Sequence, residues 1–221
     1  GRLSNSVISR VVVRNGLEGI SASYAPLVLD QMSIINNASL GIYQFYGTLT
    51  LYNTTISKNQ GGGVALYYAS AEVYNSTIAH NTSVRYSTNY GGGVRVYDGS
   101  LTIENSIVAN NSAIQAPDCY GDDYHDGFII SNGHNIIGST TGCNVTATVG
   151  DHFNVDPQIS AFLPSWWYPP LKVTSLAVDG GNPATCTTQD QRGVSRLGDG
   201  SCDIGAYEHV TPGAAVEIVA I

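Results

Sequence analysis

The sequence predicts an all-β protein, a right-handed parallel β-helix (solenoid) with about 22 residues per coil, degenerate C-terminal coils and a disulfide-stapled cap. Three observations predict this fold: a 22-residue period, short alternating segments of β-branched residues, and columns of Asn and Gly in phase with the period. Such a period is typical of stacked units. Apolar residues recur in two registers, at Val7, Leu29, Leu51, Val73 and Ile103 and at Val12, Ile34, Ile56, Ile78 and Val108.

The repeat unit contains short strands and no helical run. Residues 49–51, 71–73 and 101–103 alternate between apolar and polar side chains as strands do. Three short strands joined by Gly and Asn turns are expected in each coil, with coils about 4.8 Å apart. Parallel crossovers normally wind right-handed. One step of the repeat is eight residues longer, because of an insertion between Thr82 and Tyr90.

Two columns of Asn keep the same period. Stacked amide side chains can hydrogen-bond from coil to coil, so both columns are expected to form ladders. Asn also tolerates the left-handed turn conformation, and the Gly runs at 61–63 and 91–93 suit tight bends. The columns are Asn53, Asn75 and Asn105, and Asn15, Asn37, Asn59, Asn81 and Asn111.

The repeat becomes irregular after residue 111. The chain is therefore interpreted as one elongated domain with a regular part and an irregular part. Regular coils are expected over residues 1–111, and degenerate coils with a cap over residues 112–209. Terminal repeats of solenoids are usually atypical because they cap the core. Residues 210–221 form an apolar tail.

Composition excludes several classes of function. The net charge is −8 and the chain has no basic stripe, so nucleic acid is not an expected partner. No stretch of about 20 apolar residues is present, so no transmembrane segment is expected.

The four cysteines allow three pairings. Pairing Cys119 with Cys143 and Cys186 with Cys202 closes the shortest loops and is the expected one. A zinc site is the alternative, although no C-x-x-C motif is present. Two disulfides imply an oxidising, extracellular or cell-surface location.

Six Asn-x-Ser/Thr sequons raise the question of glycosylation. Two of them lie in the register of Asn105 and are expected to be inward-facing ladder residues. The candidates for glycosylation are Asn110 and Asn144, followed by Asn37 and Asn81.

The last part of the sequence carries a series of short motifs, which begins further upstream at residue 118. They are Asp156-Pro157, SLAVDGG at 175–181, DQRG at 190–193 and CDIGAYE at 202–208, preceded by Asp118-Cys119, GHNIIG at 133–138 and Gly142-Cys143.

This series resembles bacterial cell-surface right-handed β-helix proteins that end in a DQRG…CDIGAYE signature, often followed by a surface anchor. The Gly-Gly-Gly-Val and Asn repeats are similar to those of polymorphic outer-membrane proteins. The resemblance covers most of residues 50–209 and implies the fold and a surface location. It supplies no catalytic residues.

The regular coils are poor in catalytic groups, so the chain is not expected to be an enzyme. Glycoside hydrolysis needs two carboxylates facing each other, but no acid in the coils has a second acid at the same register of a neighbouring coil. Glu72, for example, falls beside Thr50 and Thr102.

The acids gather after residue 112, where they suggest two roles. Asp118, Asp122, Asp123 and Asp126 form a candidate Ca²⁺ loop, with a solvated acidic loop as the alternative and no other cofactor expected. Within the cap, Arg192 is expected to pair with Asp190 or Asp203. The other acids of the C-terminal motifs are Asp179 and Glu208.

Aromatic residues also follow the repeat. Tyr24, Tyr46 and Tyr68 form one column, and Tyr52 and Tyr74 form another. Stacking between coils is the expected role, and binding of a sugar or of a partner surface is the alternative. Trp166 and Trp167 cannot both face inward in an extended segment, so one is expected to cover the helix end and the other to meet a sugar or another subunit.

The tail suggests how the chain assembles. A hinge at 211–213 precedes a strand-like segment whose apolar residues are Val216, Ile218, Val219 and Ile221. An unpaired apolar strand can add to a neighbour's sheet, and a head-to-tail contact of this kind produces a filament. The sequence therefore predicts an extracellular structural protein, a subunit of a surface filament, sheath or adhesin stalk whose partners are copies of itself and surface glycans. The alternative is a carbohydrate-binding or polysaccharide-degrading (lyase- or hydrolase-like) protein.

Overall fold

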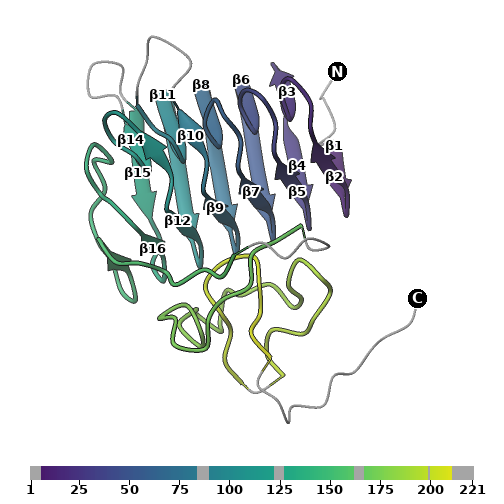
Figure 1. The fold of residues 1–221 in the computed structure, drawn as a ribbon, viewed down its shortest axis with the longest axis vertical. Helices are drawn as coiled ribbons and strands as arrows, with labels where there is room; N and C mark the ends of the chain where they lie inside the picture. The colour runs from purple at the N-terminus through teal and green to yellow at the C-terminus, as the bar shows by residue number, and fades with distance from the viewer. Residues whose placement is uncertain (1–5, 84–89, 122–126, 162–166, 199, 211–221) are drawn as a thin grey trace.

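The computed structural model describes residues 6–83, 90–121, 127–161, 167–198 and 200–210. Within them the chain winds into stacked coils whose paired strands are all parallel, as Figure 1 shows. The predicted all-β, right-handed parallel β-helix is confirmed.

Two sheets run the length of the stack, and a third holds two strands. The larger sheet contains β1 (Ser6–Ser9), β3 (Ile20–Ser23), β4 (Leu27–Asp30), β6 (Ile42–Tyr52), β8 (Val64–Tyr74), β11 (Val94–Glu104), β14 (Cys119–Gly121) and β15 (Gly127–Ser131). The smaller sheet contains β2 (Val12–Arg14), β5 (Ser33–Ile35), β7 (Thr55–Ser57), β9 (Thr77–Ala79), β12 (Ile107–Ala109), β16 (Ile136–Ile137) and β17 (His152–Phe153). The third sheet pairs β10 (Thr82–Ser83) with β13 (Ser112–Ala113).

Strand register follows the sequence period from the second coil onward. In the first coil, Val7 lies opposite Val28 and Val12 lies opposite Ser33, one residue away from the predicted register. Ile42 of β6 lies opposite Val64 of β8, 22 residues later, and Val64 lies opposite Val94 of β11 after the longer step. One detail differs from the prediction of three short strands per coil. Each of β6, β8 and β11 is a single strand of 11 residues, because the backbone bends at one residue without ending the ladder. In β6 that residue is Tyr46, whose φ is +50°.

The interior of the coils is filled by the two predicted apolar registers. From the second coil onward these side chains are buried, because alternate residues of each strand point inward. They are Leu29, Leu51, Val73 and Ile103 from the larger sheet and Ile34, Ile56, Ile78 and Val108 from the smaller sheet.

One predicted Asn ladder is confirmed from Asn37 onward. Asn15 does not belong to it, because the N–H of Gly16 is the group that donates to Oδ1 of Asn37. The side-chain amide of Asn37 donates to Oδ1 of Asn59, and the pattern repeats through Asn81 and Asn111, with N–O distances of 2.9–3.0 Å. The ladder ends at Asp118, whose carboxylate accepts from both the backbone N–H and the amide of Asn111 at 2.9 Å. Every bond points the same way along the stack.

A second ladder, which the sequence reasoning missed, runs beside the first. Backbone N–H groups donate to a side-chain oxygen one coil further on, from Thr54 to Ser76 and from Ser76 to Ser106. The N–H of Ser106 then donates to Asn135, and the N–H of Asn135 donates to Asp151 at 2.9 Å. Both ladders therefore end in a carboxylate, which has no proton to pass on when ionised.

These ladders change three predictions about single residues. Asn37 and Asn81 are buried with their amide groups bonded, which removes them as acceptors of glycans; Asn110 and Asn144 are exposed. Asp118 is buried at the ladder end, not in an exposed acidic loop.

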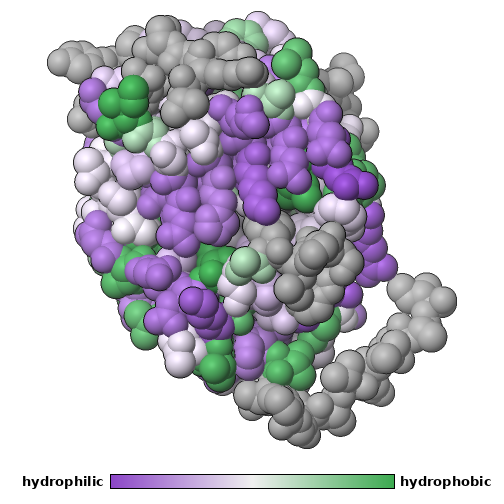
Figure 2. Space-filling view, viewed as in Figure 1, coloured by the Kyte–Doolittle hydropathy of each residue, from purple (hydrophilic) through white to green (hydrophobic). Residues whose placement is uncertain are grey.

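The rest of the C-terminal region covers the outer face of the smaller sheet. Residues 155–161, 167–198 and 200–210 lie along the flank of the coils in Figure 1, and a second apolar cluster forms between them and the sheet. Outward residues Ala79 and Ala109 pack there with Ile159, Leu171 and Ile204. Strands β5, β7, β9, β12 and β16 of the smaller sheet are therefore buried on both faces, whereas the outermost strands β2 and β17 are partly exposed. On the face seen in Figure 2, hydrophilic residues predominate and hydrophobic ones form separate small groups.

Candidate functional site

One flank of the coils carries a column of left-handed polar residues. Gln31, Asn53, Asn75, Asn105 and His134 follow one another from coil to coil, and their φ angles all lie between +44° and +54°. Asn favours this conformation because its short polar side chain bonds locally. The column lies where each strand of the larger sheet ends and the turn to the smaller sheet begins.

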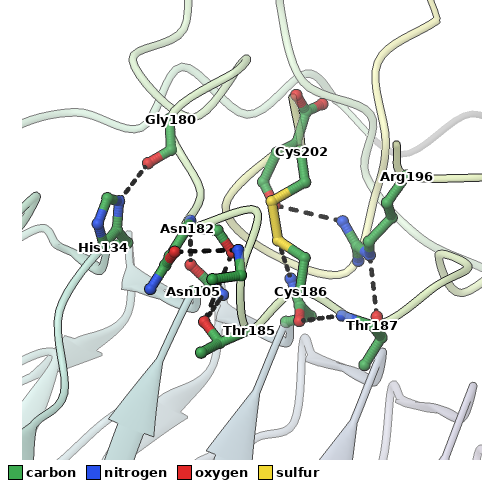
Figure 3. The surroundings of a disulfide bond; sticks show 12 residues. Asn105, His134, Gly180, Asn182, Thr185, Cys186, Thr187, Arg196 and Cys202 are labelled. Atoms are coloured by element: carbon green, nitrogen blue, oxygen red, sulfur yellow. Dashed lines mark hydrogen bonds between the residues drawn. A yellow bond between two sulfur atoms is a disulfide. The ribbon is translucent and has the colours of Figure 1, made fainter. Parts of the chain in front are cut away.

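Residues 180–196, called the strap below, bind along this column. Near one end of the strap, the carbonyl oxygen of Gly180 lies 2.9 Å from Nδ1 of His134. Further on, the N–H of Asn182 donates to Oδ1 of Asn105 at 2.8 Å, as Figure 3 shows. The strap thus runs against the direction in which the coils follow one another.

The strap continues across three more coils. The N–H of Thr187 donates to Oδ1 of Asn75 at 3.1 Å, and its hydroxyl donates to Oδ1 of Asn53 at 2.7 Å. The amide of Gln31 donates to the carbonyl of Asp190 at 2.8 Å. The prediction that Asn53, Asn75 and Asn105 form a ladder with one another is therefore wrong. The amide oxygens of all three accept hydrogen bonds from the strap, while the amide nitrogen of Asn53 donates to Asp30.

Two disulfides join the predicted pairs, Cys119–Cys143 and Cys186–Cys202. The first lies in the interior of the last coils, where both cysteines belong to the main core. The second fastens the strap to residues that follow it, and the amide of Asn75 donates to Sγ of Cys186 at 3.5 Å. These residues form the disulfide-stapled cap, which covers the flank of the coils.

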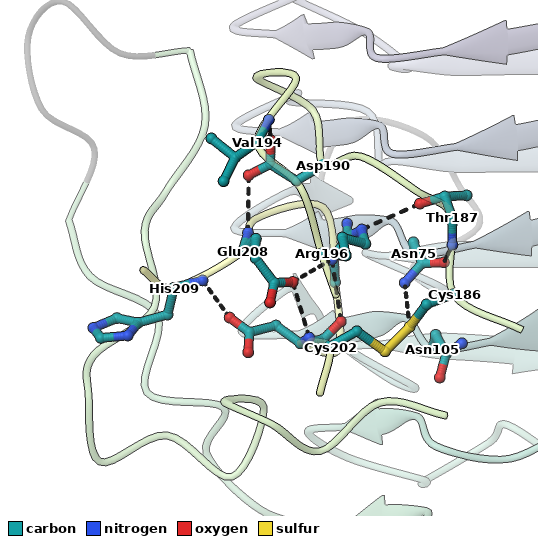
Figure 4. Close-up of polar contacts among 12 residues, drawn as sticks. Asn75, Asn105, Cys186, Thr187, Asp190, Val194, Arg196, Cys202, Glu208 and His209 are labelled. Carbon is teal, nitrogen blue, oxygen red and sulfur yellow. Dashed lines mark hydrogen bonds and ion pairs between the residues drawn. A yellow bond between two sulfur atoms is a disulfide. The ribbon is translucent and has the colours of Figure 1, made fainter. Parts of the chain in front are cut away.

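A buried arginine holds the cap together. Arg196 has no exposed surface, and all five N–H donors of its guanidinium are used. Nε donates to Thr187 Oγ1, and the two terminal nitrogens donate to Glu208 Oε2 at 3.1 Å and Asn53 Oδ1 at 3.1 Å. The remaining bonds go to the carbonyls of Asp203 and Gly205. Figure 4 shows this centre between the strap and the coils.

The carboxylates around Arg196 accept backbone donors. Asp190 accepts from the N–H groups of Arg192, Val194 and Glu208, and Asp203 accepts from those of Asp179 and His209. Each carboxylate thus fixes a turn of the chain.

The predicted ion pair of Arg192 is with Asp190, at 2.7 Å. The guanidinium of Arg192 also lies over the ring of Tyr207, 3.8 Å from its centroid. The sequence motif pointed to this arginine, whereas Arg196, which binds Glu208, was missed.

Burial raises the pKa values of two of these acids. It raises the pKa of Asp203 to about 6, and it raises the pKa of Glu208 to about 8, with repulsion from Asp203 adding to the shift. Because the folded protein then holds these protons more tightly than the unfolded chain, the stabilisation is complete below the ordinary pKa values of 3.8 and 4.5. It is lost as pH rises through the folded values.

We therefore expect the urea midpoint of unfolding to fall as pH rises from about 5 to about 9. Glu208→Gln keeps an acceptor for Arg196 and is expected to flatten the upper part of this profile, above about pH 6. Glu72→Gln, on an exposed carboxylate of β8, is the control and should keep the slope. A midpoint that stays constant or rises over this range would contradict the assignment.

The tyrosine columns stack as expected. Ring centroids of Tyr24 and Tyr46, and of Tyr46 and Tyr68, are 5.0 Å apart, with interplanar angles of 11° and 13°. Tyr52 and Tyr74 stack at 5.3 Å. The rings of neighbouring coils therefore cover one another's faces.

The remaining predicted site residues are placed only in part. Trp167 lies against Arg14 of β2, whose guanidinium carbon is 4.2 Å from the ring centroid. Trp166, the three acids Asp122, Asp123 and Asp126, and the tail residues of 216–221 lie outside the described residues. The described residues hold no group of three or more His, Cys, Asp or Glu side chains placed to bind a metal.

The acids of the regular coils have the neighbours that the repeat predicted. Glu72 lies opposite Thr50 and Thr102, and Glu104 lies opposite Tyr74. Neither faces a second carboxylate across its strand pairings, so neither has the partner that two-carboxylate hydrolysis requires. Glu104 instead accepts a hydrogen bond from Thr185 of the strap at 2.5 Å.

Comparison with known proteins identifies the coils and leaves the strap unassigned. The family described as "Right handed beta helix region" matches residues 1–149. No curated protein and no solved structure matches the chain. The matched span covers about two thirds of the sequence and ends before the strap begins. With the parallel sheets described above, this match shows that the chain belongs to the right-handed β-helix family.

Proposed function

We propose that the protein is a non-catalytic structural component of an extracellular or cell-surface assembly, a subunit of a surface filament, sheath or adhesin stalk. One observation carries the proposal: bonding is continuous across the coils. Two internal ladders, the strap and the tyrosine columns each link successive coils. A rod braced in this way resists bending and local opening, as a stalk or fibre must.

Location outside the cytoplasm is supported by two features. The two disulfides need an oxidising compartment. The motif series at 190–193 and 202–208 resembles that of bacterial surface β-helix proteins.

The residues that end the two ladders limit how two copies of the chain could join end to end. Asp118 and Asp151 each accept the last donors of a ladder and offer none to a further coil. A second copy therefore does not continue these ladders, and an end-to-end contact needs another segment. The apolar tail at 214–221 is our candidate, added as a strand to the sheet of a neighbour.

Carbohydrate binding is the second candidate function, and exposed tyrosines favour it. Tyr24, Tyr46 and Tyr68 are 64%, 38% and 42% exposed. Sugars stack on the faces of aromatic rings, however, and here the facing rings cover one another. The structural role is therefore favoured.

Sedimentation of the purified full chain tests the proposal. We expect concentration-dependent end-to-end assemblies of more than two subunits, which are lost when residues 212–221 are deleted, because the connecting strand is removed. Glu217→Gln, which keeps the apolar strand, is the control and should assemble like the parent chain. A monomer unaffected by the deletion would sink the filament hypothesis, and cleavage of a polysaccharide would overturn the non-catalytic assignment.

A further inference from the structure

The larger sheet carries a contiguous group of aromatic side chains on one half of its outer face. Their rings contact one another across three strands and the corner beside them, with centroids 4.7–6.4 Å apart. This aromatic face consists of Tyr24, Tyr43, Phe45, Tyr46, Tyr67, Tyr68 and Tyr97.

The rings of the aromatic face are fixed in a regular row. Tyr24, Tyr46 and Tyr68 repeat every 5.0 Å with nearly parallel planes. Phe45 packs edge-on against all three, at interplanar angles of 78–88°. Because stacking covers the inner ring faces, the row presents ring edges and phenol groups to solvent.

A surface with this repeat fits a partner with the same repeat. The spacing of 5.0 Å is close to the separation of about 4.8 Å between parallel strands. Another copy of the chain has that period, so rows of side chains from two copies can interdigitate along their whole length. Two sheets packed face to face in this way lie about 10 Å apart, as in side-chain zippers.

Charge favours contact at this face over other faces. Each copy carries a net charge of −8, and like charges oppose association. The aromatic face itself holds only Tyr and Phe. The charged groups beside it are Arg95, which is buried next to the ring of Tyr67, and the acids Asp98 and Glu18. The other half of the larger sheet instead carries the acids Asp30 and Glu72. Tyrosine is moreover enriched in the buried centres of protein interfaces.

We propose that the aromatic face is a lateral contact between two copies of this chain, which packs rods side by side. A self-complementary patch of this kind is used by both partners around a two-fold axis. This inference rests on the proposed structural function and adds the surface by which rods would form a bundle or sheath.

The test uses a substitution that the repeat itself allows. Asp98 occupies the corner position opposite Tyr68, with a φ of +59°, so aspartate is compatible with that backbone. In the double variant Tyr46→Asp and Tyr68→Asp, we expect the Kd for lateral pairing, measured by analytical ultracentrifugation, to rise at least about a hundredfold. The circular dichroism spectrum should be unchanged.

Tyr52→Asp is the matched control. Tyr52 stacks on Tyr74 on the other half of the larger sheet, and Asp30 occupies the same register in the preceding coil. This variant is expected to pair like the parent chain. A parent chain that stays monomeric, a double variant that pairs normally, or a control that loses pairing equally would each overturn the inference. Glycan binding by a monomer, lost in the double variant, would also overturn it.

The deletion of residues 212–221 separates this inference from the proposed function. The lateral contact predicts that the shortened chain still forms pairs, because no residue of the aromatic face is removed. Loss of end-to-end assembly with pairs retained supports both ideas. If the deletion changes nothing and pairs still form, the tail hypothesis fails while the lateral contact stands.

Discussion

Replacing Arg196 with methionine is expected to lower the free energy of unfolding by about 3–5 kcal/mol, because several buried acceptors lose their donor at about 1–3 kcal/mol each. Oε2 of Glu208, Oδ1 of Asn53 and the carbonyl of Gly205 would each lose a hydrogen bond. The effect should be largest for the cap, since Arg196 joins three separate segments there. Urea unfolding followed by circular dichroism measures it.

Two further variants make this result specific. Lys172→Met, on an exposed lysine, should leave the unfolding free energy within about 0.5 kcal/mol of the parent. The loss from combining Glu208→Gln with Arg196→Met should be smaller than the sum of the two single losses, because the two side chains share a hydrogen bond. If Arg196→Met is as stable as the parent chain, Arg196 does not hold the cap as described.

Replacing Asn81 with alanine is expected to cost at least about 4 kcal/mol, because several buried groups lose their partners at about 1–3 kcal/mol each. The N–H and amide of Asn59 lose an acceptor, and the carbonyls of Ile56 and Ala79 lose a donor. Asn111 also loses the amide that donates to it. Urea unfolding and amide hydrogen exchange in the flanking coils measure the loss.

Asn110→Gly is the control for the ladder. Asn110 is exposed and has a φ of +60°, which glycine adopts without strain. We expect a change below about 1 kcal/mol for this variant. Equal losses at the two positions would show that the backbone bend, and not the amide ladder, is what stabilises the coils.

The repeat predicted the coils well because each residue contacts the residues at the same repeat position in the neighbouring coils. Val64, for example, lies opposite Ile42 and Val94, which are the equivalent apolar residues of the coils on either side. The two Asn columns show the limit of predicting contacts from the period alone. Asn59 bonds to the next Asn, whereas Asn75 bonds to Thr187, although both columns have the same period. Their bonding partners differ because the strap covers only one column, and the strap itself has no repeat from which its position could be predicted.

The second ladder does have a signal in the sequence. Small hydroxyl residues recur at the position directly after Asn53, Asn75 and Asn105, and a small hydroxyl at a fixed period predicts hydrogen bonds between coils. Arg196 carried no such signal. Its burial depends on how the non-repeating segments at 182–191 and 202–208 fold around it, which a single sequence does not reveal.

Electron microscopy of the native, undenatured protein tests the central claim most directly. A structural rod that joins end to end should form regular fibres whose axial repeat is close to the length of one subunit. The aromatic contact should place such fibres side by side in the parent chain and leave them single in the Tyr46→Asp, Tyr68→Asp variant. Dispersed short rods at every concentration would contradict assembly as the function of this β-helix.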